Sequence, residues 1–166
     1  VFSTTAGAAN LQENGQYTVI VAGAVAAGDN SPQPIVLRDR FETSLGNNQV
    51  GIRLVHGSAN AGTVDIYLTP PGTNLENADP LVSGFDFTED FPGGFAGQFA
   101  PQAVSQEGSE LSVTPAGSTQ PVLQLLVGGS DGLQVQPGQF ITGVAIDNPQ
   151  NDPPFGALVQ VDMPTQ

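Results

Sequence analysis

The sequence predicts an all-β protein, folded as an antiparallel β-sandwich. Apolar residues alternate with polar ones over short stretches, and turns rich in Pro and Gly separate these stretches. The chain has 166 residues, of which 39% are hydrophobic, 21 are Gly and 14 are Pro. This length is enough for one ordinary domain with a real core and part of a second, and the composition is not that of a disordered chain.

Each expected strand is an alternating run bounded by turn residues, and no segment has a helical apolar period. The main turns contain a Pro that fixes φ or a Gly that permits unusual φ, as in Pro70-Pro71-Gly72 and Pro115-Ala116-Gly117. The expected strands are Val1–Thr4, Gln16–Val25, Pro34–Phe41, Gln49–His56, Thr63–Leu68, Leu81–Phe87, Gly97–Val104, Glu110–Thr114, Val122–Val127, Gln139–Ile146 and Ala157–Met163.

The chain contains an internal repeat. Gly15-Gln16-Tyr17 recurs as Gly138-Gln139-Phe140, and an ungapped shift of 123 positions also superposes Asp39 on Asp162. We therefore expect residues 1–47 to be the C-terminal strands of a truncated first repeat and residues 48–166 to be one complete repeat. Seven or eight strands in about 120 residues is typical of a β-sandwich. The core of this sandwich is expected to contain Ile52, Leu54, Val64, Ile66, Leu111, Val113, Leu123, Leu125, Phe140, Val144 and Val159.

Charge excludes some partners. The chain has three cationic side chains, all Arg, against sixteen acidic ones, and its net charge is −13. Such a surface repels phosphate backbones and anionic membranes, so nucleic acid is not expected as a partner. The longest apolar stretch, Val19–Ala27, is too short to span a bilayer, so no membrane insertion is expected. Abundant Asn, Gln, Ser, Thr and Gly favour an exported protein.

The segment Gly51-Ile52-Arg53-Leu54-Val55-His56-Gly57-Ser58-Ala59-Asn60-Ala61-Gly62-Thr63-Val64-Asp65-Ile66-Tyr67-Leu68 resembles a bacterial and archaeal exported repeat family of unknown function. That family has the pattern V-R-V-V-H-A-S-P-D-A-P-x-V-D-V-Y-V, and the turn at residues 59–62 departs from it by lacking both prolines and the acid. The segment 109–123 is similar to a further stretch of the same family. Its members are typically tandem modules of cell-surface or secreted proteins. The resemblance therefore implies an Ig-like sandwich and an extracellular or cell-surface location, with no known activity.

Four polar residues match the family pattern, and they form the candidate site. Arg53, His56, Asp65 and Tyr67 lie on two expected strands joined by a short loop. A His, an Asp and an Arg close together are compatible with catalysis or metal binding. A structural role is the favoured interpretation, with Arg53 and Asp65 in salt-bridge reach or joined through His56. A single His cannot supply the usual zinc ligands, and no nucleophile has a companion base.

Two further groups of residues are candidate ligand sites. The acidic loops Asp147-Asn148, Asn151-Asp152 and Asp86 with Glu89-Asp90 contain hard oxygen ligands that suit calcium, although solvated turn carboxylates are the default interpretation. No other cofactor is expected. The segment from Phe85 to Phe99 combines five Phe with acids and glycines, as a carbohydrate-binding surface does, but core packing is favoured.

We expect a non-enzymatic structural module of an exported cell-surface or extracellular protein, acting in adhesion, spacing or self-assembly, with filament formation as one outcome. The alternative is a carbohydrate- or ligand-binding module attached to a secreted enzyme, which would bring a glycan or surface partner. An enzyme using His56 and Asp65 as an acid–base pair is the third hypothesis.

The N-terminal segment bears most directly on function. Because the chain begins inside an expected strand, we expect a processed or trimmed subunit. Residues 1–43 cannot bury their apolar face alone, so Tyr17, Val19, Val21, Ile35, Leu37 and Phe41 need a partner surface. Two arrangements can supply it: the strands extend the sheets of the complete repeat, or they dock on a neighbouring molecule by strand addition. We favour the second, so self-association through the N-terminal strands is the expected partnership.

Overall fold

A computed structural model describes residues 11, 13–24, 30–41, 44–92, 98–148, 150 and 154–163. Within these ranges no helix is long and apolar enough to cross a membrane. The expected strand Val1–Thr4 lies outside the described residues. The described elements are β1 (Tyr17–Ala22), β2 (Gln33–Arg38), β3 (Gln49–His56), β4 (Val64–Thr69), the short 3₁₀-helix η2 (Leu75–Asn77), β5 (Val82–Phe85), β6 (Asp90–Phe91), β7 (Ala100–Ala103), β8 (Ser109–Pro115), β9 (Leu123–Val127), β10 (Phe140–Asp147) and β11 (Phe155–Asp162).

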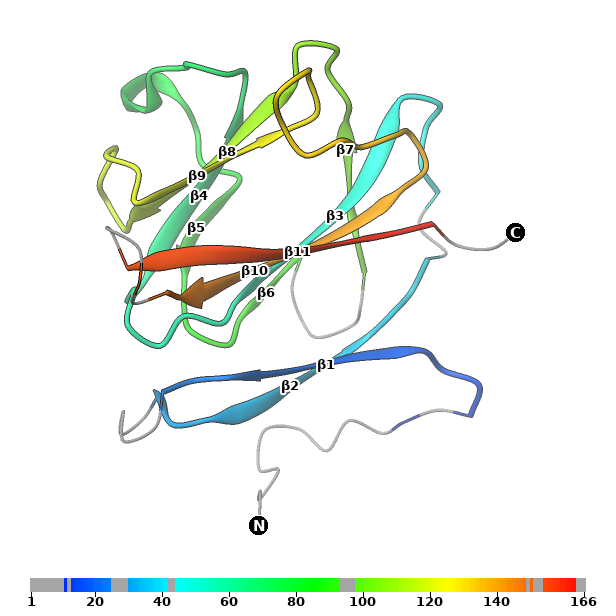
Figure 1. Cartoon of the computed structure of the whole chain (residues 1–166), viewed down its shortest axis with the longest axis vertical. Helices are drawn as coiled ribbons and strands as arrows, with labels where there is room; N and C mark the ends of the chain where they lie inside the picture. The colour runs from blue at the N-terminus through cyan, green and yellow to red at the C-terminus, as the bar shows by residue number, and fades with distance from the viewer. Residues whose placement is uncertain are drawn as a thin grey trace.

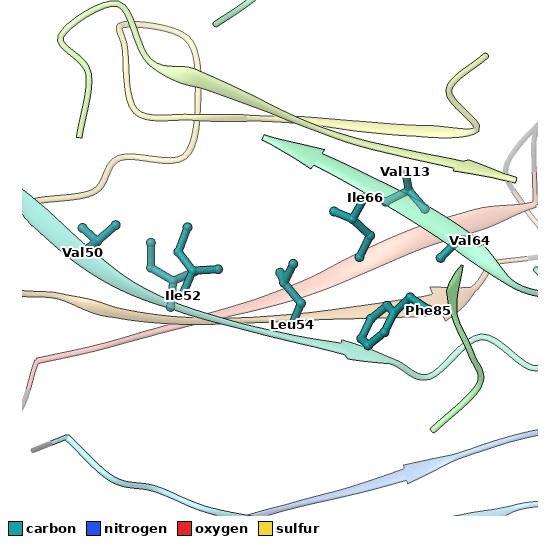
Figure 2. Packing of buried hydrophobic residues seen from close by; sticks show 8 residues of the cluster. Val50, Ile52, Leu54, Val64, Ile66, Phe85 and Val113 are labelled. Atoms are coloured by element: carbon teal, nitrogen blue, oxygen red, sulfur yellow. The ribbon is translucent and has the colours of Figure 1, made fainter. Parts of the chain in front are cut away.

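Two sheets pack face to face, which confirms the predicted all-β sandwich (Figure 1). The first has the strand order β11-β10-β3-β6, with β7 also paired to β3, and the second has the order β5-β4-β8-β9. Alternate residues of β3 point into the space between the sheets and meet residues of β4, β5 and β8 (Figure 2). This core consists of Val50, Ile52, Leu54, Val64, Ile66, Phe85, Val113 and Ile141.

One central pairing differs from the antiparallel prediction. Strands β3 and β10 run parallel, with Arg53 opposite Thr142, whereas the other described strand pairs are antiparallel. Parallel neighbours require a long connection, and here all four strands of the second sheet lie between them in the sequence. The pattern of alternation cannot show this, because it is the same for both directions.

Strand β10 is buried on both faces, which corrects part of the predicted core. Ile141 faces the second sheet, whereas Phe140 and Val144, predicted for the sandwich core, face the opposite way. Val144 instead belongs to a second hydrophobic cluster on the outer face of the first sheet. A strand covered on two sides has apolar residues at both odd and even positions, so its inward set cannot be deduced from alternation.

The N-terminal hairpin β1–β2 covers that outer face. It forms a two-stranded sheet of its own, so it extends the edge of neither large sheet, and it lies across β3 and β10 (Figure 1). Ile35 and Leu37 are buried, while Val19 and Val21 on its far face are exposed. This packing is neither sheet extension nor strand addition, the two expected arrangements, because the hairpin lies face to face on the first sheet of the same chain. The second cluster consists of Ala22, Ile35, Leu37, Val55 and Val144.

The two repeated hairpins differ in register by one residue. Tyr17 pairs with Arg38, but its repeat counterpart Phe140 pairs with Asp162, which the ungapped shift matches to Asp39. A one-residue slip in a strand exchanges its two faces. The ungapped superposition therefore holds for the first strand of each hairpin and needs a shift of one residue for the second.

Replacing Leu37 by Ala tests whether the hairpin is part of the cooperative fold. Leu37 is 0% exposed, so removing its side chain is expected to lower the free energy of unfolding by about 2–5 kcal/mol. The matched control is Val19→Ala, on the exposed face of the same hairpin, which is expected to change it little. Chemical denaturation monitored by tyrosine fluorescence and circular dichroism makes the comparison. Equal stability of both variants would show that the hairpin is not packed as described.

Candidate functional site

The four residues predicted to form one polar cluster belong to three separate networks. Arg53 and His56 lie on β3 in the first sheet, whereas Asp65 and Tyr67 lie on β4 in the second. The predicted contact between Arg53 and Asp65 is wrong. It assumed that β3 and β4 pair as a hairpin, but the chain crosses from one sheet to the other between them, and the side chain of Arg53 points away from β4.

Arg53 is at the centre of the contact between the hairpin and the first sheet. Its side chain is 1% exposed, and Nη2 donates to the Asp39 carboxylate at 2.9 Å. Its Nε and Nη2 also donate to Thr142 Oγ1, at 3.2 and 2.9 Å. On the hairpin, Thr18 Oγ1 lies 3.0 Å from both Asp39 oxygens and donates to this carboxylate. We call this contact between β1–β2 and the outer face of β3 and β10 the hairpin junction.

Aromatic rings complete one side of the hairpin junction. The Arg53 guanidinium carbon lies 4.6 Å from the centre of the Phe99 ring, a cation–π distance. Phe99 in turn packs on Phe140 and on Phe41, with ring centres 4.9 and 5.7 Å apart. A Cβ at Gly51 would stand 2.7 Å from the Phe140 ring, so this glycine makes the close approach of the rings to β3 feasible. The guanidinium is thus bounded by a carboxylate, a hydroxyl and an aromatic face.

A second polar network organises the loop between β3 and β4. Asp147, at the end of β10, accepts hydrogen bonds from the hydroxyl of Ser58, from the backbone N–H of Ala59 at 3.0 Å and from Asn60 Nδ2 at 3.0 Å. Asn30, in the turn of the N-terminal hairpin, donates to the Ala59 carbonyl at 2.7 Å. Hydrogen bonds from both the first sheet and the hairpin therefore fix this loop, although it lacks the two prolines of the family that the segment 51–68 resembles.

His56 closes the same loop from inside. It is 0% exposed, and its Nε2 lies 2.9 Å from the Gly62 carbonyl. Since a carbonyl only accepts, Nε2 carries the proton. The ring packs near Phe85 and Phe87, and Nδ1 has no hydrogen-bond partner among the described residues. His56 also lines an apolar cavity of about 40 Å³ between the sheets, where it is the one polar side chain of the lining.

Asp65 fixes two turns of the second sheet. It is buried, and its oxygens accept from the backbone N–H of Gly84 at 2.8 Å, from that of Gly117 at 2.9 Å and from Ser83 Oγ at 3.1 Å. The Gly117 N–H lowers the pKa of Asp65, and the donors at Gly84 and Ser83 lower it further against the opposing effect of burial. Tyr67 is buried two residues further along β4, on the same face as Asp65.

The acidic loops are occupied by internal donors where they are described. Both Asp147 oxygens accept hydrogen bonds from the β3–β4 loop, and Asp86 Oδ1 accepts from Thr63 Oγ1 at 2.5 Å. Glu89 Oε2 accepts from the Asp86 N–H at 2.9 Å. Residues 151–152 lie outside the described ranges. In the part of the chain that the structure describes, no three His, Asp or Glu side chains gather to hold a metal ion.

The phenylalanines of residues 85–99 pack inward wherever they are described. Phe85 is in the sandwich core, and Phe91 packs against it from β6. Phe87 packs against the second cluster, and Phe99 is buried beneath Arg53. Phe95 lies outside the described residues. The described rings therefore contribute to packing, which is the interpretation that the sequence favoured over a carbohydrate-binding surface.

Comparison with known proteins adds a family similarity. A family model for a domain of unknown function, DUF4397, matches residues 2–67. This segment is less than half of the chain and contains β1, β2, β3 and the first part of β4. It includes both Asp39 and Arg53, and it crosses the boundary expected at residue 47. No curated protein matches the chain.

The contact of Asp39 with Arg53 and the contact of Asp147 with the β3–β4 loop were not predicted from the sequence. The internal repeat matches Asp39 to Asp162, which was the one sequence feature that singled it out. Asp162 accepts a hydrogen bond from Gln160 on its own strand, so the match gave no indication that Asp39 contacts Arg53. Asp147 was considered as a calcium ligand. Nothing in the local sequence shows that a loop 88 positions away wraps its carboxylate.

Removing the Asp39 carboxylate tests the hairpin junction. Asp39→Ala leaves the buried Arg53 guanidinium without its counter-ion, and a loss of about 3–5 kcal/mol in the free energy of unfolding is expected. Asp162, which the ungapped shift of 123 positions matches to Asp39, provides a control. The Asp162→Ala substitution removes the same carboxylate from an exposed side-chain contact. Thermal and denaturant unfolding measure both. A loss for Asp39→Ala no larger than for Asp162→Ala would contradict the assignment.

The lowered pKa of Asp65 predicts a pH-dependent stability contribution. The folded state favours the ionised carboxylate, so the contribution is complete above the ordinary pKa and is lost as the pH falls through the lowered one. Asp65→Asn is therefore expected to destabilise the protein at neutral pH, by about 1–3 kcal/mol for the lost acceptor. The gap between the two proteins should shrink below about pH 4. Denaturant titrations at several pH values check this, and a gap independent of pH would refute it.

Proposed function

We propose that this chain is a non-enzymatic structural module of an exported cell-surface or extracellular protein, in which the hairpin of one repeat is fixed to the sheet of the next. The observation that carries the proposal is the hairpin junction. It joins residues 17–39, interpreted as the end of one repeat, to strands β3 and β10 of the following repeat through a buried ion pair and an apolar cluster.

The physical character of this contact favours spacing over flexible tethering. Domains joined by a polar linker alone move relative to one another, whereas a large apolar contact restrains them. Here Leu37 and Val55 are almost completely buried together, and Asp39 and Arg53 add a directional contact that fixes the rotation of the hairpin. Such repeats would form a stiff array, which is the property that adhesion, spacing or filament formation requires.

Three features support the exported tandem-repeat setting. The match of residues 2–67 to a domain family of unknown function agrees with the resemblance of the segment 51–68 to exported repeat proteins. The internal repeat places equivalent hairpins at both ends of the sequence given. The net charge of −13 and the abundance of Asn, Gln, Ser, Thr and Gly suit an exported protein.

The carbohydrate-binding alternative has a weaker basis. It requires exposed aromatic rings, but Phe91 is partly buried and packs against the sandwich core. Phe95 lies outside the described residues, so a glycan array with the intact chain and a Phe95→Ala variant is the direct test of this alternative.

Locating the native protein tests the proposed function. Antibody labelling of intact source cells, read by electron microscopy, is expected to mark the cell envelope or extracellular filaments. Labelling that appears only after the cells are opened would reject the proposal.

A force-extension measurement tests the mechanical role of the hairpin junction. Asp39→Ala is expected to lower the force at which the hairpin detaches, and Asp162→Ala is expected to leave it unchanged.

A further inference from the structure

The outer edge of β11 has no partner strand among the described residues. Strand β11 has eight residues, pairs with β10 on one side, and pairs with no other described strand. Exposed edges of this kind recruit further strands unless charges, Pro, bulges or short length prevent it. Residues 155–161 contain no charge and no Pro, and the pairing of β11 with β10 has no bulge.

The other free edges are shorter or interrupted. Strand β2 contains Pro34, β7 contains Pro101, and β5 is a four-residue strand whose pairing with β4 is irregular. Strands β1 and β9 contain no Pro, but they have only six and five residues. Among the described strands, β11 therefore offers the longest regular edge that is open to a partner.

The free backbone donors of β11 can be assigned. The Asn148 N–H donates to the Pro154 carbonyl at 2.8 Å, which makes this the first bonded pair of the hairpin. Bonded and non-bonded pairs alternate along an antiparallel ladder. The N–H groups of Ala157, Val159 and Val161 therefore point away from β10, toward the open side of the sheet.

Apolar surface accompanies this edge. Leu158 is 59% exposed at the middle of the strand, and Val161 and Met163 are exposed near its end. Ala157 and Val159 line the apolar cavity between the sheets, opposite Leu123 and Leu125 of β9. A strand added beside β11 would thus cover apolar side chains as well as satisfy backbone groups.

We propose that β11 pairs antiparallel with β11 of a second copy of this chain, about a two-fold axis near Leu158. The first sheet of each copy would then be part of one continuous sheet. The inference rests on the proposed structural role and names a surface through which modules assemble. A self-complementary contact of this kind is isologous and closes as a dimer. Joined to the repeat-to-repeat contact of the hairpin, it would link arrays side by side.

Charge favours the antiparallel orientation for the second copy. The chain is strongly acidic, yet the one charged residue of β11 is Asp162 at its end. In antiparallel pairing centred on Leu158 the two Asp162 carboxylates lie roughly 25 Å apart at about 3.4 Å per residue, well beyond the screening length in physiological salt. Parallel pairing would place them side by side.

Two variants and one control test the proposal on the full chain. Leu158→Glu places like charges opposite each other at the axis, and Ala157→Pro removes an outward N–H without breaking the ladder to β10. Val21→Glu makes the same charge change at a residue of similar exposure, 65%, on the outer face of the hairpin. Light scattering with size-exclusion chromatography over a wide concentration range gives the mass, and thermal unfolding confirms that each variant folds.

The unmodified chain and Val21→Glu are expected to reach the dimer mass as concentration rises, whereas Leu158→Glu and Ala157→Pro stay monomeric. Amide hydrogen exchange should show protection at Ala157 and Val159 that grows with concentration. A monomer at every concentration, or association lost in Val21→Glu and kept in Leu158→Glu, would overturn the inference. A monomeric protein found on the cell envelope would refute the β11 pairing and leave the proposed function intact.

Discussion

The buried charge of Arg53 constrains the structure more than any other single group. A guanidinium at 1% exposure is costly unless an anion and hydrogen-bond acceptors surround it. The central strand β3 supplies the cation, β10 supplies the Thr142 hydroxyl, and the hairpin must bring Asp39 to the same point. The position of the hairpin is therefore tied to the charge balance of the sheet, and the aromatic rings beneath Arg53 exclude the water that would otherwise relax this requirement.

The same arrangement gives the first sheet two buried faces. The second sheet covers one face, and the hairpin covers the other through Ile35 and Leu37. Polar residues predicted to cooperate are thereby separated: Arg53 serves the hairpin, His56 the loop between the sheets, and Asp65 the turns of the second sheet. Arg53, His56 and Asp65 each bind at least one other group of the chain, although Nη1 of Arg53 and Nδ1 of His56 have no hydrogen-bond partner among the described residues.

Local sequence predicted the strands well because alternation and turn residues are local signals. The bounds of β3 were predicted without error, and the described ends of the other expected strands are displaced by a few residues. Strand β6 was missed because its two residues are too few to show a period. The core residues of β4 were predicted correctly, as Val64 and Ile66 lie on a strand with one apolar face.

What the sequence did not predict depends on contacts between distant segments. The partner of Arg53 follows from where a separate hairpin packs, and no periodicity contains that information. The faces of β10 could not be assigned, because both are buried and both have apolar residues such as Phe140 and Ile141. The role of Asp147 depends on a loop that is close in space but remote in the chain.

The parallel pairing of β3 with β10 has a consequence for how the chain acquires its fold. Arg53 and Thr142, which face each other in this ladder, are 89 positions apart, so the central pair forms only after a long loop has closed. High contact order of this kind slows folding. Until β10 arrives, β3 lacks a central neighbour and the hairpin lacks part of the surface it covers. A chain that is synthesised from its N-terminus would therefore complete its native sheet late, only after β10 has been made.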